Sequence, residues 1–383
     1  MKKLLLASAI AALSVSAANA APTVYGKVFL TADYVDEEAK AVNHDENGVE
    51  ISSQGSRIGF KGSEPMTANT DIIYQLEYGI DVDGDDNESF KNRDTYLGLK
   101  NNSFGEFRVG KNQSTTDYIN NVIVNEGYWD NLGSAKLDKE QKVAALNMAD
   151  SGRIGNSIVW KAPKFEGVPV EFAAMYANDD NYAGEKNNGW GASLMFDQGT
   201  GYTFGLAYEK DLNLNGEDDF LIVDNAGNPI LKDNKKQYET KFNGGDLIRG
   251  TATLDLATFN SGLPVTLGAL YQEADYDYGD KKEKGYVISA QMGLTNFVKP
   301  ATIYAQYNDT SNLYGVDGFD SNQIVVGGKY YYQKNIIAHA YIGQNDADNV
   351  PGVIVVDADA GTTRNVKGDG KVFAVGGGLE YKF

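Results

Sequence analysis

The C-terminal stretch KVFAVGGGLEYKF, residues 371–383, decides the fold class of this chain. Its apolar and aromatic side chains recur at every second position, and small or polar residues lie between them. A period of two indicates a β-strand, because successive side chains of a strand point to opposite faces. The same alternation recurs at 24–34, 68–81, 165–178, 201–209, 262–274, 285–294 and 321–332, and we read sixteen strand-like segments in all.

The connections between these segments alternate strictly between two kinds. One kind is short and rich in turn-forming residues, at 62–67, 101–103, 163–167, 198–201, 260–262, 295–296 and 333–335. The other is mostly longer and polar, at 36–47, 82–88, 112–151, 179–188, 211–244, 275–284, 309–321 and 345–369. In an up-and-down meander, alternate links lie at opposite ends. The pattern therefore predicts an all-β fold, a transmembrane antiparallel barrel of 16 strands with short periplasmic turns and long external loops.

The charge of the chain is concentrated in the long links. The whole sequence carries 53 acidic and 34 basic residues, a formal net charge of −19. The long links hold 37 of the acids against 14 bases, which leaves the remainder of the mature chain close to neutral. An acidic chain does not suit nucleic-acid binding, and the absence of cysteine excludes disulfide scaffolds and thiol nucleophiles.

The first twenty residues have the pattern of a secretory signal peptide. Lys2 and Lys3 form a basic start, an apolar run follows, and Ala18-Asn19-Ala20 fits a cleavage site. We predict a signal peptide at 1–20 and one barrel domain at 21–383. An exported chain of this kind is expected in the outer membrane of a Gram-negative bacterium.

Several motifs, in order, resemble the Gram-negative general porin family. They are VYGK at 24–27, GSRIGFKGSE at 55–64, NRDTYLGLK at 92–100, FGEFRVGK at 104–111, NSIVWKAP at 156–163 and the terminal YKF at 381–383. The resemblance implies a sixteen-stranded, non-enzymatic barrel that assembles as a homotrimer. It also implies an outer-membrane lipid and lipopolysaccharide environment, small hydrophilic solutes as cargo, and recognition of Phe383 by the barrel-assembly machinery.

The family's third loop folds into the pore, and here it corresponds to 112–151. By the resemblance, Lys27, Arg57, Arg93 and Arg153 form the basic wall of the constriction. Strand alternation turns three of these bases away from lipid, but it would turn Asp94 toward lipid beside Tyr96 and so weakens the assignment of Arg93.

Acidic residues of the third loop are expected to face the basic wall. The candidates are Asp117, near a short helical turn predicted at 114–121, and Glu126 and Asp130, which flank an aromatic pair. That pair, Tyr128-Trp129, is predicted to pack against the barrel wall. Ordinary solvated loop acids are the alternative reading for each.

The leading hypothesis is an outer-membrane porin for passive diffusion, with a weak cation preference from its acidic loops. A substrate-selective barrel, for example for oligosaccharides, would need a track of lumen aromatics, for which Tyr25 and Phe29 are candidates. A secreted acidic β-sandwich adhesin is the third alternative. No resident cofactor or catalytic site is expected. The partial EF-hand pattern at 211–222 lacks its final acid, which leaves only weak divalent cation binding by the external loops.

Overall fold

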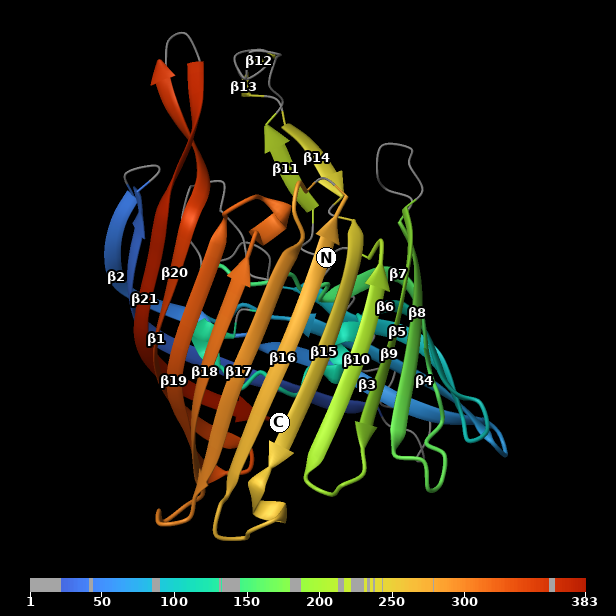
Figure 1. Ribbon diagram of the computed structural model, residues 1–383. Helices are drawn as coiled ribbons and strands as arrows, with labels where there is room; N and C mark the ends of the chain where they lie inside the picture. The colour runs from blue at the N-terminus through green and yellow to red at the C-terminus, as the bar shows by residue number, and fades with distance from the viewer. Residues whose placement is uncertain are drawn as a thin grey trace.

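The chain forms one closed, antiparallel β-barrel in this computed structural model (Figure 1). The structure describes residues 22–40, 44–84, 90–130, 132, 145–179, 187–212, 217–221, 231–232, 235–236, 238–242, 244–277, 279–357 and 362–383. The predicted signal peptide at 1–20 lies outside these ranges. Within them, no helix has the length and apolarity needed to cross a membrane.

Seventeen strand segments build the barrel wall. They are β1 (Thr23–Ala39), β2 (His44–Ser53), β3 (Arg57–Thr67), β4 (Thr70–Gly79), β5 (Lys91–Asn101), β6 (Gly105–Gln113), β7 (Arg153–Lys161), β8 (Val170–Asp179), β9 (Asn187–Asp197), β10 (Tyr202–Lys210), β15 (Gly245–Asp255), β16 (Val265–Tyr276), β17 (Glu283–Leu294), β18 (Ala301–Ser311), β19 (Asp320–Gln333), β20 (Ile336–Asp357) and β21 (Thr362–Lys382). Because β2 and β3 both pair with β1, they are two halves of one strand. The wall therefore has 16 strands, which confirms the predicted fold class.

Pairing between the first and last strands closes the barrel. β1 and β21 are antiparallel from Lys27 opposite Lys382 to Ala39 opposite Gly370. Closure leaves no free sheet edge there, as a membrane barrel requires. The secreted β-sandwich alternative is therefore wrong.

The two faces of the wall differ in polarity as the alternation predicts. Leu206, Ile248, Ile288 and Ile324 are about half exposed and point outward, like the other apolar side chains in register with them. Their neighbours along each strand, such as Arg249, are buried and point inward. An apolar outer belt around a polar interior is what a barrel needs in a bilayer.

Turns at one end are short and loops at the other are long, as Figure 1 shows with the long loops at the top. The long-loop end also carries the small pairs β11 (Glu217–Leu221) with β14 (Tyr238–Phe242) and β12 (Leu231–Lys232) with β13 (Lys235–Lys236). Four 3-10 helices complete the described elements: η2 (Thr115–Ile119), η3 (Gly127–Trp129), η4 (Leu256–Thr258) and η5 (Leu313–Gly315).

Three predicted links are wrong in extent, and all three are strand where a loop or turn was expected. The turn predicted at 62–67 belongs to β3, and the chain reverses at 68–69 instead. The loops predicted at 36–47 and 345–369 are mostly paired strand, because β1–β2 pairing reaches Ala39 opposite His44 and β20–β21 pairing reaches Asp357 opposite Thr362. Polar composition misled the prediction, since strands that project beyond the bilayer need no apolar face.

Candidate pore constriction

The third loop crosses the inside of the barrel and returns. Near its start η2 packs on β8, β9 and β10, and further along Trp129 reaches β20 and β21. On the way back, Leu146 donates its backbone N–H to Asn345 (3.0 Å), and Ala149 donates its own to Glu283 (2.7 Å). A single segment can contact the polar faces of this many strands only if it lies inside the barrel. The helical turn predicted at 114–121 is present as η2.

Glycines on the inner wall leave room for this loop. A Cβ atom at any of four of them would lie within about 3 Å of a loop side chain, closer than ordinary van der Waals contact. The four glycines and the residues they face are Gly205 with Ile119, Gly268 with Val122, Gly285 with Met148, and Gly343 with Trp129.

Trp129 is the largest fully buried side chain of the loop. It packs in a cluster with Val35, Tyr304, Tyr341 and Ala374, all on the inner wall, and the neighbouring Tyr128 packs against the same cluster. The predicted packing of the Tyr128-Trp129 pair on the wall is therefore confirmed.

Buried polar residues of the wall fix both ends of the loop. Glu209 accepts hydrogen bonds from the Thr115 hydroxyl and the Thr116 backbone N–H, each at 2.8 Å, and from the Ser151 hydroxyl. Arg249, fully buried, donates to Asp150 (3.1 Å). The sequence analysis did not identify either residue. Their position on strands whose inward residues are otherwise small or uncharged was the available signal.

The four basic residues predicted for the wall meet at one cavity. Lys27, Arg57, Arg93 and Arg153 line a space of about 430 Å³ between the wall and the third loop. Asp117 and Asp130 of the loop line the same space, and so does Asp150, which the sequence analysis missed. Bases on the wall therefore face acids on the loop across a short gap.

The predicted acid Glu126 lies elsewhere on the loop. Its carboxylate accepts a hydrogen bond from the Lys329 ammonium group of β19, and it is not among the residues that line the cavity. Glu126 is thus paired with a wall base that the sequence analysis did not name.

Alternation misjudged Asp94 because Tyr96, on the same face, points inward: Leu97 and Leu99 are the exposed residues of β5, and the Arg108 guanidinium group lies over the Tyr96 ring. A β-bulge then brings Arg93 to this inner face as well. Thr95 lies opposite Leu76, but the next outward pair joins Asn92 to Tyr78, so β5 has one extra residue there. Arg93 therefore lines the cavity while Asp94 also reaches inward, where it accepts a hydrogen bond from Arg153 Nε at 3.0 Å. The prediction of an outward Asp94 is wrong.

Acids on the wall strands accompany every predicted base. Arg93 Nε donates to Glu77 at 2.7 Å, and Arg57 Nε lies 3.9 Å from the same carboxylate. Lys27 Nζ lies 3.9 Å from Glu380, which also contacts His339 at 3.0 Å. None of these acids was predicted, because nothing in the sequence of a single strand shows which residues of its neighbours lie beside it.

Two loop acids titrate above their usual range. Burial inside the barrel and the nearby charge of Asp150 raise the pKa of Asp117 to about 7. Enclosure and the charge of Glu126 raise the pKa of Asp130 to about 6, although its side chain is open to the lumen. Asp117 in particular changes its charge near neutral pH.

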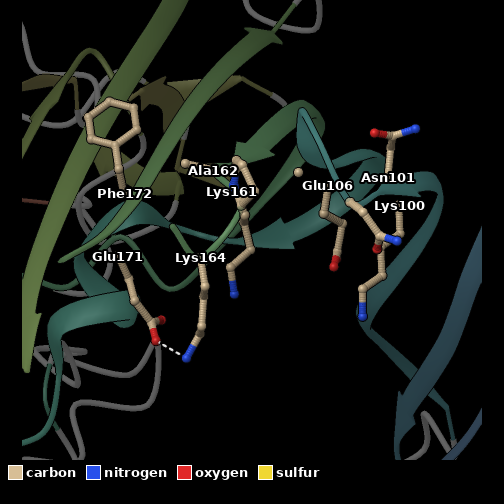
Figure 2. Close-up of a pocket in the computed structure, with 11 residues that line it drawn as sticks. Lys100, Asn101, Glu106, Lys161, Ala162, Lys164, Glu171 and Phe172 are labelled. Carbon is tan, nitrogen blue, oxygen red and sulfur yellow. Dashed lines mark ion pairs between the residues drawn. The ribbon is translucent and has the colours of Figure 1, made fainter. Parts of the chain in front are cut away.

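A second cavity of mixed charge, about 390 Å³, lies at the short-turn end (Figure 2). The side chains of Lys100, Lys161 and Glu106 reach it from β5, β7 and β6, and an ion pair between Lys164 and Glu171 lies at its side. Lys161 also lies over the ring of Tyr118 in the third loop, with its ammonium 4.5 Å from the ring centre. In the part of the chain that the structure describes, no cluster of acids and histidines of the kind that holds a metal ion is present.

Comparison with known proteins identifies the family. The family model for the Gram-negative porin matches residues 7–350, most of the chain. The chain belongs to the Gram-negative porins. This porin is 30% identical to the major outer membrane protein P.IB of Neisseria gonorrhoeae, with 88% of the chain and 92% of that protein covered. It is 25% identical to the P.IB protein of Neisseria meningitidis serogroup B, with both chains covered in full.

Solved structures share the fold of this porin at low sequence identity. The anion-selective porin from Comamonas acidovorans has a TM-score of 0.63 at 17% identity, over 95% of this chain and all of that one. The trimer form of OmpT from Vibrio cholerae has a TM-score of 0.59 at 15% identity, over 95% of this chain and 99% of that one. Membership of the Gram-negative porins, together with the P.IB relatives, makes the chain an outer-membrane protein of a family of non-enzymatic channels.

Proposed function

We propose that this porin forms a water-filled channel through which small hydrophilic solutes and ions diffuse passively, with a weak preference for cations. One observation carries the preference. The cavity is lined by four bases, but three loop acids line it as well, and Glu77, Asp94 and Glu380 lie beside the bases. Each of the four bases therefore has a wall carboxylate beside it, which cancels much of the positive charge that the bases would otherwise present to the passage.

The acidic loops at the long-loop end add to this preference. A negative mouth raises the local concentration of cations, and salt screens the effect within a Debye length of about 8 Å at physiological ionic strength. The third loop narrows the passage, so that pore width and the lining charges together select solutes.

The aromatic residues suggested for an oligosaccharide track favour the non-specific channel instead. The Lys61 ammonium lies over the ring of Tyr25 at 4.8 Å, and the Lys27 ammonium lies over that of Phe29 at 5.3 Å. A sugar would have to displace a cation from each ring before it stacked there.

We further propose that the chain assembles as a homotrimer among outer-membrane lipids and lipopolysaccharide, after export directed by residues 1–20. Phe383 would be read by the barrel-assembly machinery. Its backbone bonds to Gly26 in both directions, at 2.9 and 3.1 Å, which joins the C-terminus to the first strand. Divalent cation binding by the acidic external loops stays a prediction.

Recording in planar lipid bilayers tests the channel. Conductance that closes in three equal steps is expected from a trimer, together with a reversal potential that favours potassium over chloride. A reversal potential that favours chloride would overturn the cation preference, and an absence of conductance steps would overturn the channel.

A further inference from the structure

We propose that Glu77 of β4 is a selectivity-determining residue, which neutralises Arg57 and Arg93 from behind the constriction. The proposal rests on the channel function proposed above and names the group that controls it. Glu77 lies on the wall, opposite the loop acids that were expected to carry the negative charge.

One carboxylate serves three partners. Glu77 Oε1 accepts from Arg93 Nε at 2.7 Å, while Oε2 accepts from the Tyr25 hydroxyl at 3.0 Å and lies 3.9 Å from Arg57 Nε. The Glu77 side chain is 7% exposed, against 31% for Arg57 and 22% for Arg93. The carboxylate is thus covered by the two guanidinium groups, which themselves face the cavity.

Two local features of the backbone build this arrangement. Gly59 lies opposite Glu77 in β3, and a Cβ there would lie 2.5 Å from the Tyr25 ring, so only glycine lets the ring cross to the carboxylate. On the other side, the bulge in β5 turns Arg93 inward beside Glu77. A carboxylate placed by a ring that only glycine admits and by a β-bulge has a defined position rather than a generic one on the lumen surface.

Removing the carboxylate would leave two adjacent guanidinium groups without their shared counter-charge. Asp117, Asp130 and Asp150 face them across the cavity, so a released Arg93 would extend toward the loop. The passage would then become more positive and narrower. The added positive charge disfavours cations relative to anions, while the narrowing lowers the conductance of both. Neither effect requires the barrel to change.

The expected size follows from Coulomb's law. One charge in water at roughly 8 Å changes the local concentration of a monovalent ion about two-fold at an ionic strength of about 0.01 M. Cations and anions respond in opposite directions, so the potassium-to-chloride permeability ratio should fall about four-fold. At about 0.15 M, screening should reduce this fall to about two-fold.

The experiment compares the full chain with its Glu77→Gln variant in planar bilayers, by reversal potential under a potassium chloride gradient at both salt levels. The matched control is Glu171→Gln, which removes an equal charge from the half-exposed ion pair with Lys164 in Figure 2. For Glu77→Gln we expect the potassium-to-chloride permeability ratio to fall about four-fold at about 0.01 M salt and about two-fold at about 0.15 M. For the control we expect this ratio to change by less than about 1.5-fold.

Two further variants guard against a folding defect. Arg93→Gln should raise the permeability ratio, and the double variant Glu77→Gln/Arg93→Gln should return it to within about two-fold of the original. All variants are first checked for heat-modifiable migration as folded barrels.

An unchanged ratio in folded Glu77→Gln would overturn the proposal, and so would an equal fall in the control. Wild-type protein without conductance steps would instead overturn the channel function itself. The two failures are therefore distinguishable.

Discussion

The most direct test of the seated third loop is to remove Glu209. This wall residue is fully buried and accepts three hydrogen bonds from the loop, two near its start and one from Ser151 near its end. Hydrogen bonds to a charged group contribute about 1.5–3 kcal/mol each. Since water replaces part of the loss and the three are not additive, Glu209→Ala should weaken the seating of the loop by about 3–6 kcal/mol.

A loss of that size raises the population of the unseated loop about 100-fold or more, since each 1.4 kcal/mol is a factor of ten. Glu209→Gln keeps one acceptor oxygen and the shape of the side chain. It loses the charge, and its other oxygen becomes an amide group that donates instead of accepting. Because the Ser151 hydroxyl can accept from that amide, the effect should be about 1–2 kcal/mol. The population of the unseated loop should therefore be highest in Glu209→Ala, intermediate in Glu209→Gln and lowest in the wild type.

Hydrogen exchange in detergent micelles measures the effect at the site, because the Thr116 backbone N–H itself donates to Glu209. Exchange of this amide should accelerate in the predicted order, and single-channel records should show more frequent current fluctuations. Glu171→Gln, at the rim, is the control and should leave Thr116 unchanged. If Thr116 exchange in folded Glu209→Ala stays within about three-fold of wild type, Glu209 does not hold the loop.

Three more predictions follow from the same site. Gly343→Val should displace Trp129, because a Cβ atom at position 343 would lie 2.6 Å from the Cε2 atom of Trp129. The displacement should shift the fluorescence emission of Trp129 to longer wavelength. Gly250→Val is the control, since a Cβ atom at position 250 meets nothing within 4 Å. The potassium-to-chloride permeability ratio should rise between pH 5 and 8, because Asp130, with a pKa of about 6, and Asp117, with a pKa of about 7, gain their negative charges over this range; a response of full size in the double variant Asp117→Asn/Asp130→Asn would contradict this. Lys329→Met should raise the permeability ratio about two-fold at low salt by leaving Glu126 without its partner, and a fall would refute that pairing.

The barrel could be predicted from the sequence because the alternation within each strand shows which residues face lipid and which face the lumen. Alternation from residue 24 to residue 383 and the sorting of the links needed no knowledge of partners, and the strand number and closure are as expected. The errors at 36–47 and 345–369 arose where strands leave the bilayer. There, no side of the strand faces lipid, so apolar residues need not keep to every second position; in VPGVIVV at 350–356 they are adjacent.

The constriction was predicted only in part, for a different physical reason. The positions of Lys27, Arg57, Arg93 and Arg153 came from motif resemblance, and all four line one cavity. Their partners depend on the register between strands and on one extra residue in β5, which brings Arg93 to the inner face beside Asp94. Neither property is visible in a single strand, so Glu77 and Glu380 were missed although both are plain in the sequence.

The charge of the chain therefore acts at two ranges. In the proposed function, the acids of the external loops gather cations at the mouth, and salt removes that influence over about 8 Å at physiological ionic strength. At the constriction, an ion passes the charges at the roughly 8 Å used above, which is about one screening length at physiological ionic strength, so part of their effect remains. Ion selectivity that remains at high salt is therefore expected to come from the constriction. There, one buried carboxylate has a larger effect on selectivity than many exposed ones. Measuring the permeability ratio as a function of salt separates the two contributions in one protein.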